Sequence, residues 1–445
     1  MKFFTLFLPG LIVLVCAITN IPSLILANPN ATNQAETLEI KSAVKQAYKM
    51  KVLIGTIGIS DRIAAIAKVI EADLRLPREK QTGFEIIIEQ FASEPNGKSE
   101  IKKLLDRGFS LVVFLSATGI DDISYRIYDA TDATMVKGKK LVLTHYSIAN
   151  TGHYLAGILT QEFLGRPIQF GAQLAFCKQD SKKGGKQLFA TDPHAEHAYQ
   201  TLVSSQTPKF GLRWFMHDDH KFLYYSEQSP VNVRLMQYDM EQKRSKLVMN
   251  FDGLNMQPSF NKDGSKVVVC CSQAGSSQLY RGTLDPLRKQ WIFKRLTHNN
   301  GNNISPYLCK NGDVFFCSDY QTRSPQLYCY RDKDGSIDRL TDGGYCASPA
   351  VCEEQGKIAY IKLINNVAQI CMYDIATKNH TQVTFDATQK DEPSWSPCGT
   401  YLAYSVEQGT YSRIAVRNMI SQEAYFVTAA HEQCTSPAWG PGVMC

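Results

Sequence analysis

The sequence predicts an α/β N-terminal domain followed by an all-β six-bladed β-propeller that a C-terminal strand closes. Two repeats in the second half of the chain, and an alternation of strand and helix in the first half, carry this prediction. In the second half, leucine or valine followed by threonine or valine recurs every forty-odd residues. The pairs are Leu202-Val203, Leu247-Val248, Leu296-Thr297, Leu340-Thr341, Val383-Thr384 and Val427-Thr428. A strand-rich repeat of this length is typical of a propeller with one four-stranded blade per repeat.

A second marker runs in step with the first. Each repeat opens on a short segment, at residues 213–215, 258–260, 306–308, 349–351, 393–395 and 437–439, and all but the first begin with proline. Four openings are followed by a turn glycine, at Gly264, Gly312, Gly356 and Gly399. Glycine accepts the positive φ that a tight hairpin demands, so the chain reverses there into a β-rich run. Each repeat is therefore predicted to be a meander of four strands, A to D.

The phase of the repeat predicts how the ring closes. The first repeat begins with a B-like run at residues 172–176 and a C-like run at 187–189, with no A strand before them. The last segment, residues 437–439, is an A strand with no blade after it. The two fragments complete one blade. Such a blade protects sheet edges that would otherwise be open to aggregation.

The N-terminus has the composition of an export signal. Lys2 precedes an apolar run, and a second apolar stretch ends at Ala27 before a polar segment. We interpret residues 1–27 as a signal peptide and residues 28–50 as a flexible N-terminal segment. A membrane anchor is the alternative, and a lipoprotein based on Cys16 is less favoured because Leu14 and Val15 before it are not small. The mature chain is expected in the periplasm and is not expected to span a membrane.

Strand and helix alternate over residues 51–165, which predicts a compact α/β domain. Strands are expected at residues 52–57, 84–89, 110–115, 124–129 and 139–143, and helices at 61–76, 99–107 and 150–164. The turn-forming residues 165–167 mark the boundary to the propeller, residues 168–445.

Charge and cysteine content exclude some functions. The net charge is +6 and the basic residues are dispersed, apart from Lys178, Lys182, Lys183 and Lys186 in a B–C loop, so nucleic-acid binding is not expected. The thirteen cysteines include no C-x-x-C pair, and several fall inside predicted strands, where cysteine behaves as a small buried hydrophobe. We expect mostly free thiols. The pairs to test for disulfides are Cys346 with Cys352 and Cys434 with Cys445.

Motifs that carry chemistry are missing. There is no G-x-S-x-G, no G-x-x-x-x-G-K and no H-E-x-x-H. Two H-x-x-H pairs, His194 with His197 and His217 with His220, fall in expected turns, and residues 332–335 suit a C–D turn better than a calcium loop. We predict no catalytic residue, no metal and no cofactor. The alternatives are a propeller enzyme acting on sugars through the channel, and a glycan-binding propeller.

The repeats resemble those of the TolB family, the periplasmic components of the Tol-Pal envelope system of Gram-negative bacteria. The P-x-W-S-P-x-G pattern is clearest at residues 393–399 and 437–441, and the resemblance spans nearly the whole mature chain. There are departures. Proline is missing at Arg213, the turn aspartate survives only at Asp263, and Leu308 and Val351 replace aromatic residues.

This resemblance implies a non-enzymatic scaffold. Members bind the lipoprotein Pal through the propeller and communicate with TolA, and they support outer-membrane integrity and invagination during cell division. Other outer-membrane proteins are possible further partners. In the family, Pal docks over the face that bears the D–A loops. The matching residues directly precede the repeat prolines and are expected in loops: Asn255, Met256, Gln257, Asn303, Ile304, Ser305, Asp391 and Glu392.

A second contact is expected in the N-terminal segment. Thr37, Leu38, Glu39 and Ile40 alternate like a strand within a polar stretch. An extended segment of this kind suits β-augmentation, in which a peptide adds a strand to a partner's sheet. The family implies TolA as that partner. The alternative is that these residues lead into the α/β domain.

Overall fold

A computed structural model describes residues 49–74, 83–119, 122–129, 133–142, 147–164, 170–179, 185–192, 199–217, 220–288 and 290–442. The predicted signal peptide, residues 28–48 of the predicted N-terminal segment with Thr37, Leu38, Glu39 and Ile40, the boundary at residues 165–167 and the pair His194 and His197 lie outside these residues. Residues 49 and 50, predicted as part of the flexible segment, instead begin the first strand. Within them, no helix has the length and hydrophobicity needed to span a membrane.

The first part of the chain forms a five-stranded mixed sheet. Its strands are β1 (Lys49–Ile57), β2 (Gly83–Phe91), β3 (Leu111–Ala117), β4 (Asp122–Asp129) and β5 (Met135–Val142), in the order β2-β1-β3-β4-β5. Strands β2 and β3 run parallel to β1, and β4 and β5 continue as an antiparallel meander. The helices are α3 (Asp61–Leu74), α4 (Lys98–Leu105) and α5 (Ile148–Leu164). The predicted α/β elements are confirmed to within a few residues at each end.

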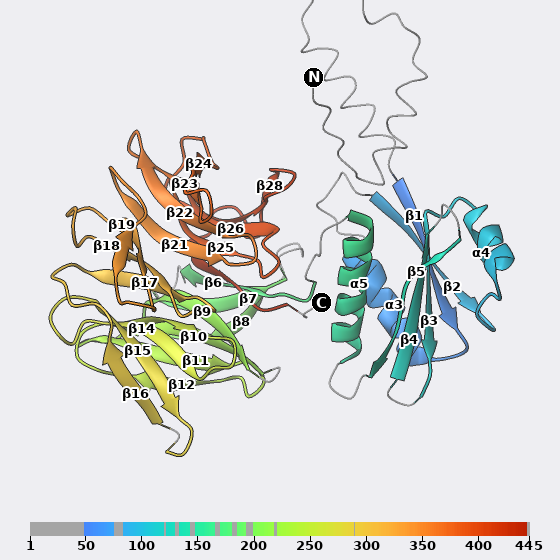
Figure 1. Cartoon of the computed structure of the whole chain (residues 1–445), viewed down its shortest axis with the longest axis horizontal. Helices are drawn as coiled ribbons and strands as arrows, with labels where there is room; N and C mark the ends of the chain where they lie inside the picture. The colour runs from blue at the N-terminus through green and yellow to red at the C-terminus, as the bar shows by residue number, and fades with distance from the viewer. Residues whose placement is uncertain are drawn as a thin grey trace, which may run out of the picture.

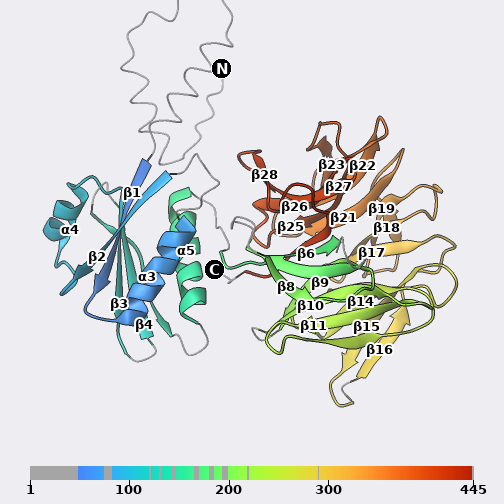
Figure 2. The same ribbon diagram turned by 180° about the vertical axis from the view of Figure 1, so that it is seen from behind.

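Alternation along β1 explains why both faces of this sheet are covered. Val52 and Ile54 pack with α3 and α5, whereas Leu53 points to the other face and packs with Ile101 of α4. Gly152 allows α5 to approach α3 closely, because a Cβ at this position would meet Val69 at 2.5 Å. Figures 1 and 2 show α5 on the side of the sheet that faces the propeller and α4 on the far side.

The rest of the described chain forms six four-stranded antiparallel sheets, so the prediction of a six-bladed propeller is confirmed. The first blade contains β9 (Lys209–His217), β10 (His220–Gln228), β11 (Val233–Asp239) and β12 (Arg244–Met249). The second contains β13 (Asn255–Phe260), β14 (Lys266–Cys271), β15 (Gln278–Asp285) and β16 (Gln290–Arg295). The third contains β17 (Asn303–Leu308), β18 (Val314–Ser318), β19 (Gln326–Tyr330) and β20 (Ile337–Arg339).

The fourth blade contains β21 (Cys346–Cys352), β22 (Lys357–Ile364), β23 (Val367–Asp374) and β24 (His380–Gln382). The fifth contains β25 (Lys390–Trp395), β26 (Tyr401–Gln408), β27 (Tyr411–Asn418) and β28 (Ala424–Phe426). The A strands β9, β13, β17, β21, β25 and β29 each contact the next one around the ring and so surround the central channel.

The sixth blade joins the two ends of the propeller, as the phase of the repeat predicted. Its C-terminal strand β29 (Cys434–Trp439) pairs with β6 (Leu174–Gln179), followed by β7 (Lys186–Thr191) and β8 (Tyr199–Val203). The pairing is antiparallel, with Cys434 opposite Lys178 and Trp439 opposite Leu174. We call this the closing blade. This pairing joins two segments that are far apart in the chain and so closes the ring.

The recurring threonine has a structural role in each of four blades. Its hydroxyl accepts a hydrogen bond, 2.9 Å long, from a backbone N–H of the C strand: Thr297 from Leu279, Thr341 from Leu327, Thr384 from Ile370 and Thr428 from Ile414. Thr341 and Thr384 also donate to the glutamine that precedes this residue in the C strand. All four threonines are buried. The repeated threonine therefore ties the D–A connection to the third strand of its own blade.

Cysteine is free throughout the described part of the chain, and most of these side chains are buried. The expectation of mostly free thiols is confirmed there, but the candidate pair Cys346 and Cys352 is wrong. These residues lie at opposite ends of β21, six residues apart, which is roughly 20 Å along a strand and far beyond disulfide reach. Cys434 is free, and Cys445 lies outside the described residues.

Candidate binding surface around the central channel

The residues that precede the repeat prolines are strand residues, which corrects the expectation that they form loops. Asn255, Met256 and Gln257 begin β13, Asn303, Ile304 and Ser305 begin β17, and Asp391 and Glu392 lie in β25. A proline follows these residues in each of the three strands. Proline has no N–H to donate to a neighbouring strand, and it is tolerated here because the pairing of the inner strand with the next strand is irregular at this position. The eight residues therefore lie on rigid elements around the channel.

Two of these residues are buried, and their side chains form hydrogen bonds with backbone carbonyl groups. The side-chain amide of Asn255 donates to the carbonyl oxygens of Val233 (2.8 Å) and Phe251 (2.7 Å), and Asn255 is fully buried. Asn303 is also fully buried and donates to the carbonyl oxygen of Gly301 (3.1 Å). Neither side chain can reach a partner.

Lysine takes the same place in two other blades. The ammonium group of Lys390 donates to the carbonyl oxygen of Thr388 (2.6 Å) and pairs with Asp386, while the side chain is 2% exposed. Lys209 is completely buried and lies 3.4 Å from the carboxylate of Glu227. In these four blades, then, the first part of the inner strand fixes the D–A connection that leads into it.

One residue per inner strand has a left-handed backbone conformation, and together these six residues form what we call the channel ring. They are Gly211 (φ 64°), Gln257 (53°), Ser305 (53°), Ser348 (51°), Glu392 (52°) and Ser436 (54°). The A–B pairing shifts register around this position in every blade. A bulge with positive φ redirects the chain and re-aims the neighbouring side chain. Five of the six positions bear a non-glycine residue, so the surrounding structure must hold this conformation.

Hydrogen bonds between neighbouring blades hold the channel ring. The N–H of Ser305 donates to the side-chain oxygen of Gln257 (2.9 Å). The N–H and hydroxyl of Ser436 donate to the two carboxylate oxygens of Glu392, at 2.5 and 2.7 Å. The hydroxyl of Ser348 donates to Asp391 (2.9 Å). These bonds link the second blade to the third, the fourth to the fifth and the fifth to the sixth, so most side chains of the rim are held by a neighbouring blade.

Opposite charges face the channel. Burial raises the pKa of Glu392, although the hydrogen bonds from Ser436 oppose this effect. Burial lowers the pKa of Arg213, and the negative charge of Glu392 acts in the opposite direction. Arg213 takes the place next to the channel ring that Ser259 and Ser394 occupy in other blades. The channel therefore carries a polarised lining that the sequence repeat alone did not indicate.

Accessibility divides the eight predicted residues. Asp391 is exposed, and Gln257, Ile304 and Glu392 are partly exposed. Asn255, Met256, Asn303 and Ser305 are buried. Only the first group offers side-chain surface to a partner.

The opposite mouth of the channel has a hollow that the sequence analysis missed. Its volume is about 1020 Å³, and its walls include Trp214, Phe215, Phe260 and Trp439. Phe215 stacks on Phe260 with ring centroids 4.4 Å apart. The signal was present in the sequence, because three of these aromatic residues recur at the second position after the repeat proline or its substitute.

The residues that the structure describes include few side chains placed for metal binding or nucleophilic chemistry. No cluster of three or more histidine, cysteine or acidic side chains there could hold a metal ion. Burial raises the pKa of the Cys177 and Cys317 thiols to about 12, so these groups stay protonated. His217 and His220 face each other across the β9–β10 hairpin, and His220 pairs with Glu241 at 2.9 Å.

Comparison with known proteins agrees with this architecture. A family model described as "TolB beta propeller domain" matches residues 161–443. Tol-Pal system protein TolB of Ruthia magnifica subsp. Calyptogena magnifica is 23% identical over 323 residues, covering 72% of this chain and 74% of the relative. The protein of the same name from Francisella tularensis subsp. mediasiatica is 23% identical over 302 residues, covering 65% and 68%. The crystal structure of TolB from Acinetobacter baumannii superposes with a TM-score of 0.66 at 21% identity, covering 88% of this chain and 97% of that one.

Proposed function

Because the chain belongs to the TolB β-propeller family, we propose that it is a non-enzymatic scaffold of a Tol-Pal system in the periplasm. In this role the propeller binds the lipoprotein Pal and the N-terminal region binds TolA, and the assembly supports outer-membrane integrity and invagination during division. The observation that carries the proposal is the channel ring, a rigid polar rim on a closed propeller. In the described residues no cluster of side chains could hold a metal ion, and this supports a binding role over metal-dependent catalysis.

The accessible part of the rim is the proposed Pal-binding surface. Asp391 and Glu392 supply acidic groups on one blade, and Gln257 and Ile304 supply a polar and an apolar group on two others. Bulged strands and inter-blade hydrogen bonds fix their positions before any partner arrives. A preorganised surface loses little conformational entropy on association, which favours affinity.

Charge reversal tests this surface. We expect Asp391→Arg to weaken Pal binding by about tenfold or more, because a rim carboxylate becomes a cation next to whatever it contacts. The measurement is isothermal titration calorimetry with purified Pal. Glu354→Arg is the control, since Glu354 is exposed and lies on the β21–β22 turn at the opposite face of the propeller. Equal Pal affinity for Asp391→Arg and the unsubstituted chain would refute the surface.

The TolA contact is assigned to the N-terminal segment and rests on the family resemblance together with its strand-like pattern at Thr37, Leu38, Glu39 and Ile40. Deletion of residues 28–42 from the exported chain should abolish TolA binding while Pal binding persists. A pulldown with each purified partner separates these outcomes. TolA binding that survives the deletion would place the contact elsewhere.

Export is proposed to remove residues 1–27. N-terminal sequencing of the protein from a periplasmic fraction should begin at Asn28. A chain that retains Met1 and fractionates with membranes would instead indicate the anchor.

A further inference from the structure

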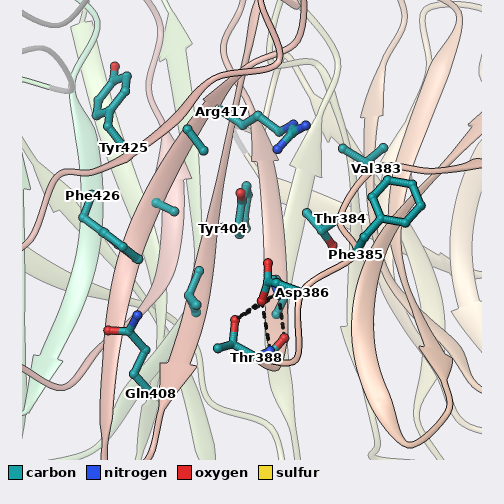
Figure 3. Close-up of a pocket in the computed structure, with 14 residues that line it drawn as sticks. Val383, Thr384, Phe385, Asp386, Thr388, Tyr404, Gln408, Arg417, Tyr425 and Phe426 are labelled. Atoms are coloured by element: carbon teal, nitrogen blue, oxygen red, sulfur yellow. Dashed lines mark hydrogen bonds and ion pairs between the residues drawn. The ribbon is translucent and has the colours of Figure 1, made fainter. Parts of the chain in front are cut away.

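A separate cavity lies under the connection between the fourth and fifth blades, away from the channel ring. Its volume is about 420 Å³. The connection from Val383 to Lys390 forms one wall, and strands β26, β27 and β28 form the others (Figure 3). Val406, Ala415 and Phe426 give it an apolar interior. Phe385 stands at its edge with 76% of its surface exposed. We call this cavity the blade-five pocket.

Three charged side chains line the blade-five pocket, and their charges sum to a net positive charge. They are Asp386, Lys390 and Arg417. Asp386 accepts hydrogen bonds from Lys390 and Thr388. Burial would raise the pKa of Asp386, but these bonds outweigh it and lower the pKa to about 2, so this carboxylate is ionised and committed to Lys390. Arg417 remains as the third charge, and the pocket is therefore positive by one.

Arg417 has unused capacity to bind an anion. Its Nη2 donates to the side-chain oxygen of Gln422 (3.0 Å), and it contacts the hydroxyl of Tyr404. Its Nε is buried without a hydrogen-bond partner, and no carboxylate in the described residues forms an ion pair with this guanidinium. In Figure 3 the guanidinium extends from its strand toward Val383 and Thr384. A buried, unpaired N–H on a charged group is costly and invites a ligand oxygen.

The repeat shows that this arginine is not required by the fold. Arg417 stands three residues after Ile414, whose N–H bonds the repeat threonine of the fifth blade. The equivalent residues of three other blades are Gly282, Tyr330 and Tyr373, counted from the matching N–H groups. A propeller blade therefore forms without a cation at this place.

We propose that the blade-five pocket binds a carboxylate carried on a small apolar body, with the guanidinium of Arg417 holding the carboxylate and the apolar walls and Phe385 covering the rest. Guanidinium and carboxylate match in geometry as well as in charge. The apolar interior excludes water from the pair and selects against small inorganic anions, which would leave the walls uncovered. The carboxylate could belong to a free metabolite or to the C-terminus of a peptide. This site does not depend on the proposed binding of Pal.

The test uses the full mature chain and two pairs of probes. The first pair is 3-phenylpropionate and its neutral amide, and the second is a short peptide ending in phenylalanine with a free or an amidated C-terminus. Binding is followed by calorimetry and ligand-observed NMR. We expect each acid that fits to bind at least about tenfold more tightly than its amide, because a charge-assisted pair is lost in the amide. Tight binding of the first acid alone identifies a small-molecule site, and of the peptide acid alone a site for a chain terminus.

Substitution locates the effect. Arg417→Gln should remove the preference for the acid over the amide, and Arg339→Gln should leave it unchanged, because Arg339 is an exposed arginine already paired with Asp342. Melting curves check that both variants fold, and retained Pal binding by Arg417→Gln would separate this site from the channel ring. The proposal is overturned if neither acid binds better than its amide, or if Arg417→Gln keeps the full preference.

Discussion

The closing blade and the third blade each have four strands, but different contacts hold these strands together. In the third blade, Thr341 bonds the N–H of Leu327, 14 residues earlier in the chain. In the closing blade the corresponding position is Val203, which has no hydroxyl. There, Glu432 accepts from Lys178 (2.5 Å) and Tyr199 (3.1 Å), across 254 and 233 residues.

This difference follows from where each blade's strands lie in the chain. The third blade forms from local hairpins, and a neutral hydrogen bond fixes its last connection. The closing blade must join segments that are hundreds of residues apart, and the entropy of closing that loop has to be offset. Charge-assisted hydrogen bonds are stronger than neutral ones, which suits Glu432 to this place. Continuous blades are locally encoded, whereas ring closure depends on a few long-range contacts.

Removal of residues 434–445 should have the largest effect, because it takes the C-terminal strand out of the closing blade. Without β29, the edge of β6 loses its partner and the channel loses one of its six inner strands. We expect loss of the cooperative melting transition, or aggregation through the open edge. Size-exclusion chromatography and a thermal melt measure both. A truncated chain that stays monomeric with an unchanged Tm would show that the ring does not depend on this junction.

Glu432→Gln tests the polar contacts of the closing blade alone. The substitution keeps the shape of the side chain but removes the charge that Lys178 and Tyr199 contact, and both members of the ion pair are largely buried. We expect a loss of about 2 kcal/mol in the free energy of unfolding. Urea denaturation gives this value. Glu354→Gln, which breaks an exposed pair with Lys310, should cost no more than about 0.5 kcal/mol.

Thr341→Val tests the hydrogen bonds that the repeat threonine forms within the third blade. Valine has nearly the same shape, but it leaves the N–H of Leu327 and the side-chain oxygen of Gln326 without their present partner. We expect a loss of about 1 to 2 kcal/mol in the free energy of unfolding. The reverse change, Val203→Thr in the closing blade, is the matched control and should change it by less than about 0.5 kcal/mol. Equal costs at both positions would remove the distinction between the blades.

The smallest effect concerns pH and lies where the two kinds of blade meet, at Glu392 and Ser436. Because burial raises the pKa of Glu392 in the folded chain, its contribution to stability is fully present below its ordinary pKa near 4.5. That contribution is lost as the pH rises through the folded pKa. Glu392→Gln should therefore flatten the dependence of Tm on pH above about pH 4.5. Parallel pH profiles for both proteins would show that this carboxylate is not perturbed.

The sequence was sufficient for the architecture because periodic features report local structure. Turn glycines, repeat prolines and the recurring Leu-Thr pair each mark one place in a meander, and their phase predicted that β29 would pair with β6. It was not sufficient for the rim. Gln257 and Glu392 have left-handed backbones that side-chain type does not announce, and Asn255 and Asn303 look like loop residues until their buried hydrogen bonds are seen.

The remaining features depend on contacts between distant segments. Glu432 is one acidic residue among many until Lys178 lies beside it, and Arg417 gains its interest only from a cavity that two blades form together. Neither pattern repeats, so no period in the sequence indicates them.

Folding protects the cysteine thiols of this chain from oxidation by burying them. Burial raises the pKa of Cys270 to about 12, so this thiol stays protonated at pH 7, whereas the thiolate is the form that oxidants modify and that attacks disulfides. The unfolded chain has no such shelter, since its cysteines return to an ordinary pKa. In an oxidising compartment, each unfolded molecule can therefore be trapped by a wrong disulfide, and the speed with which the ring closes decides how much of the protein escapes that damage.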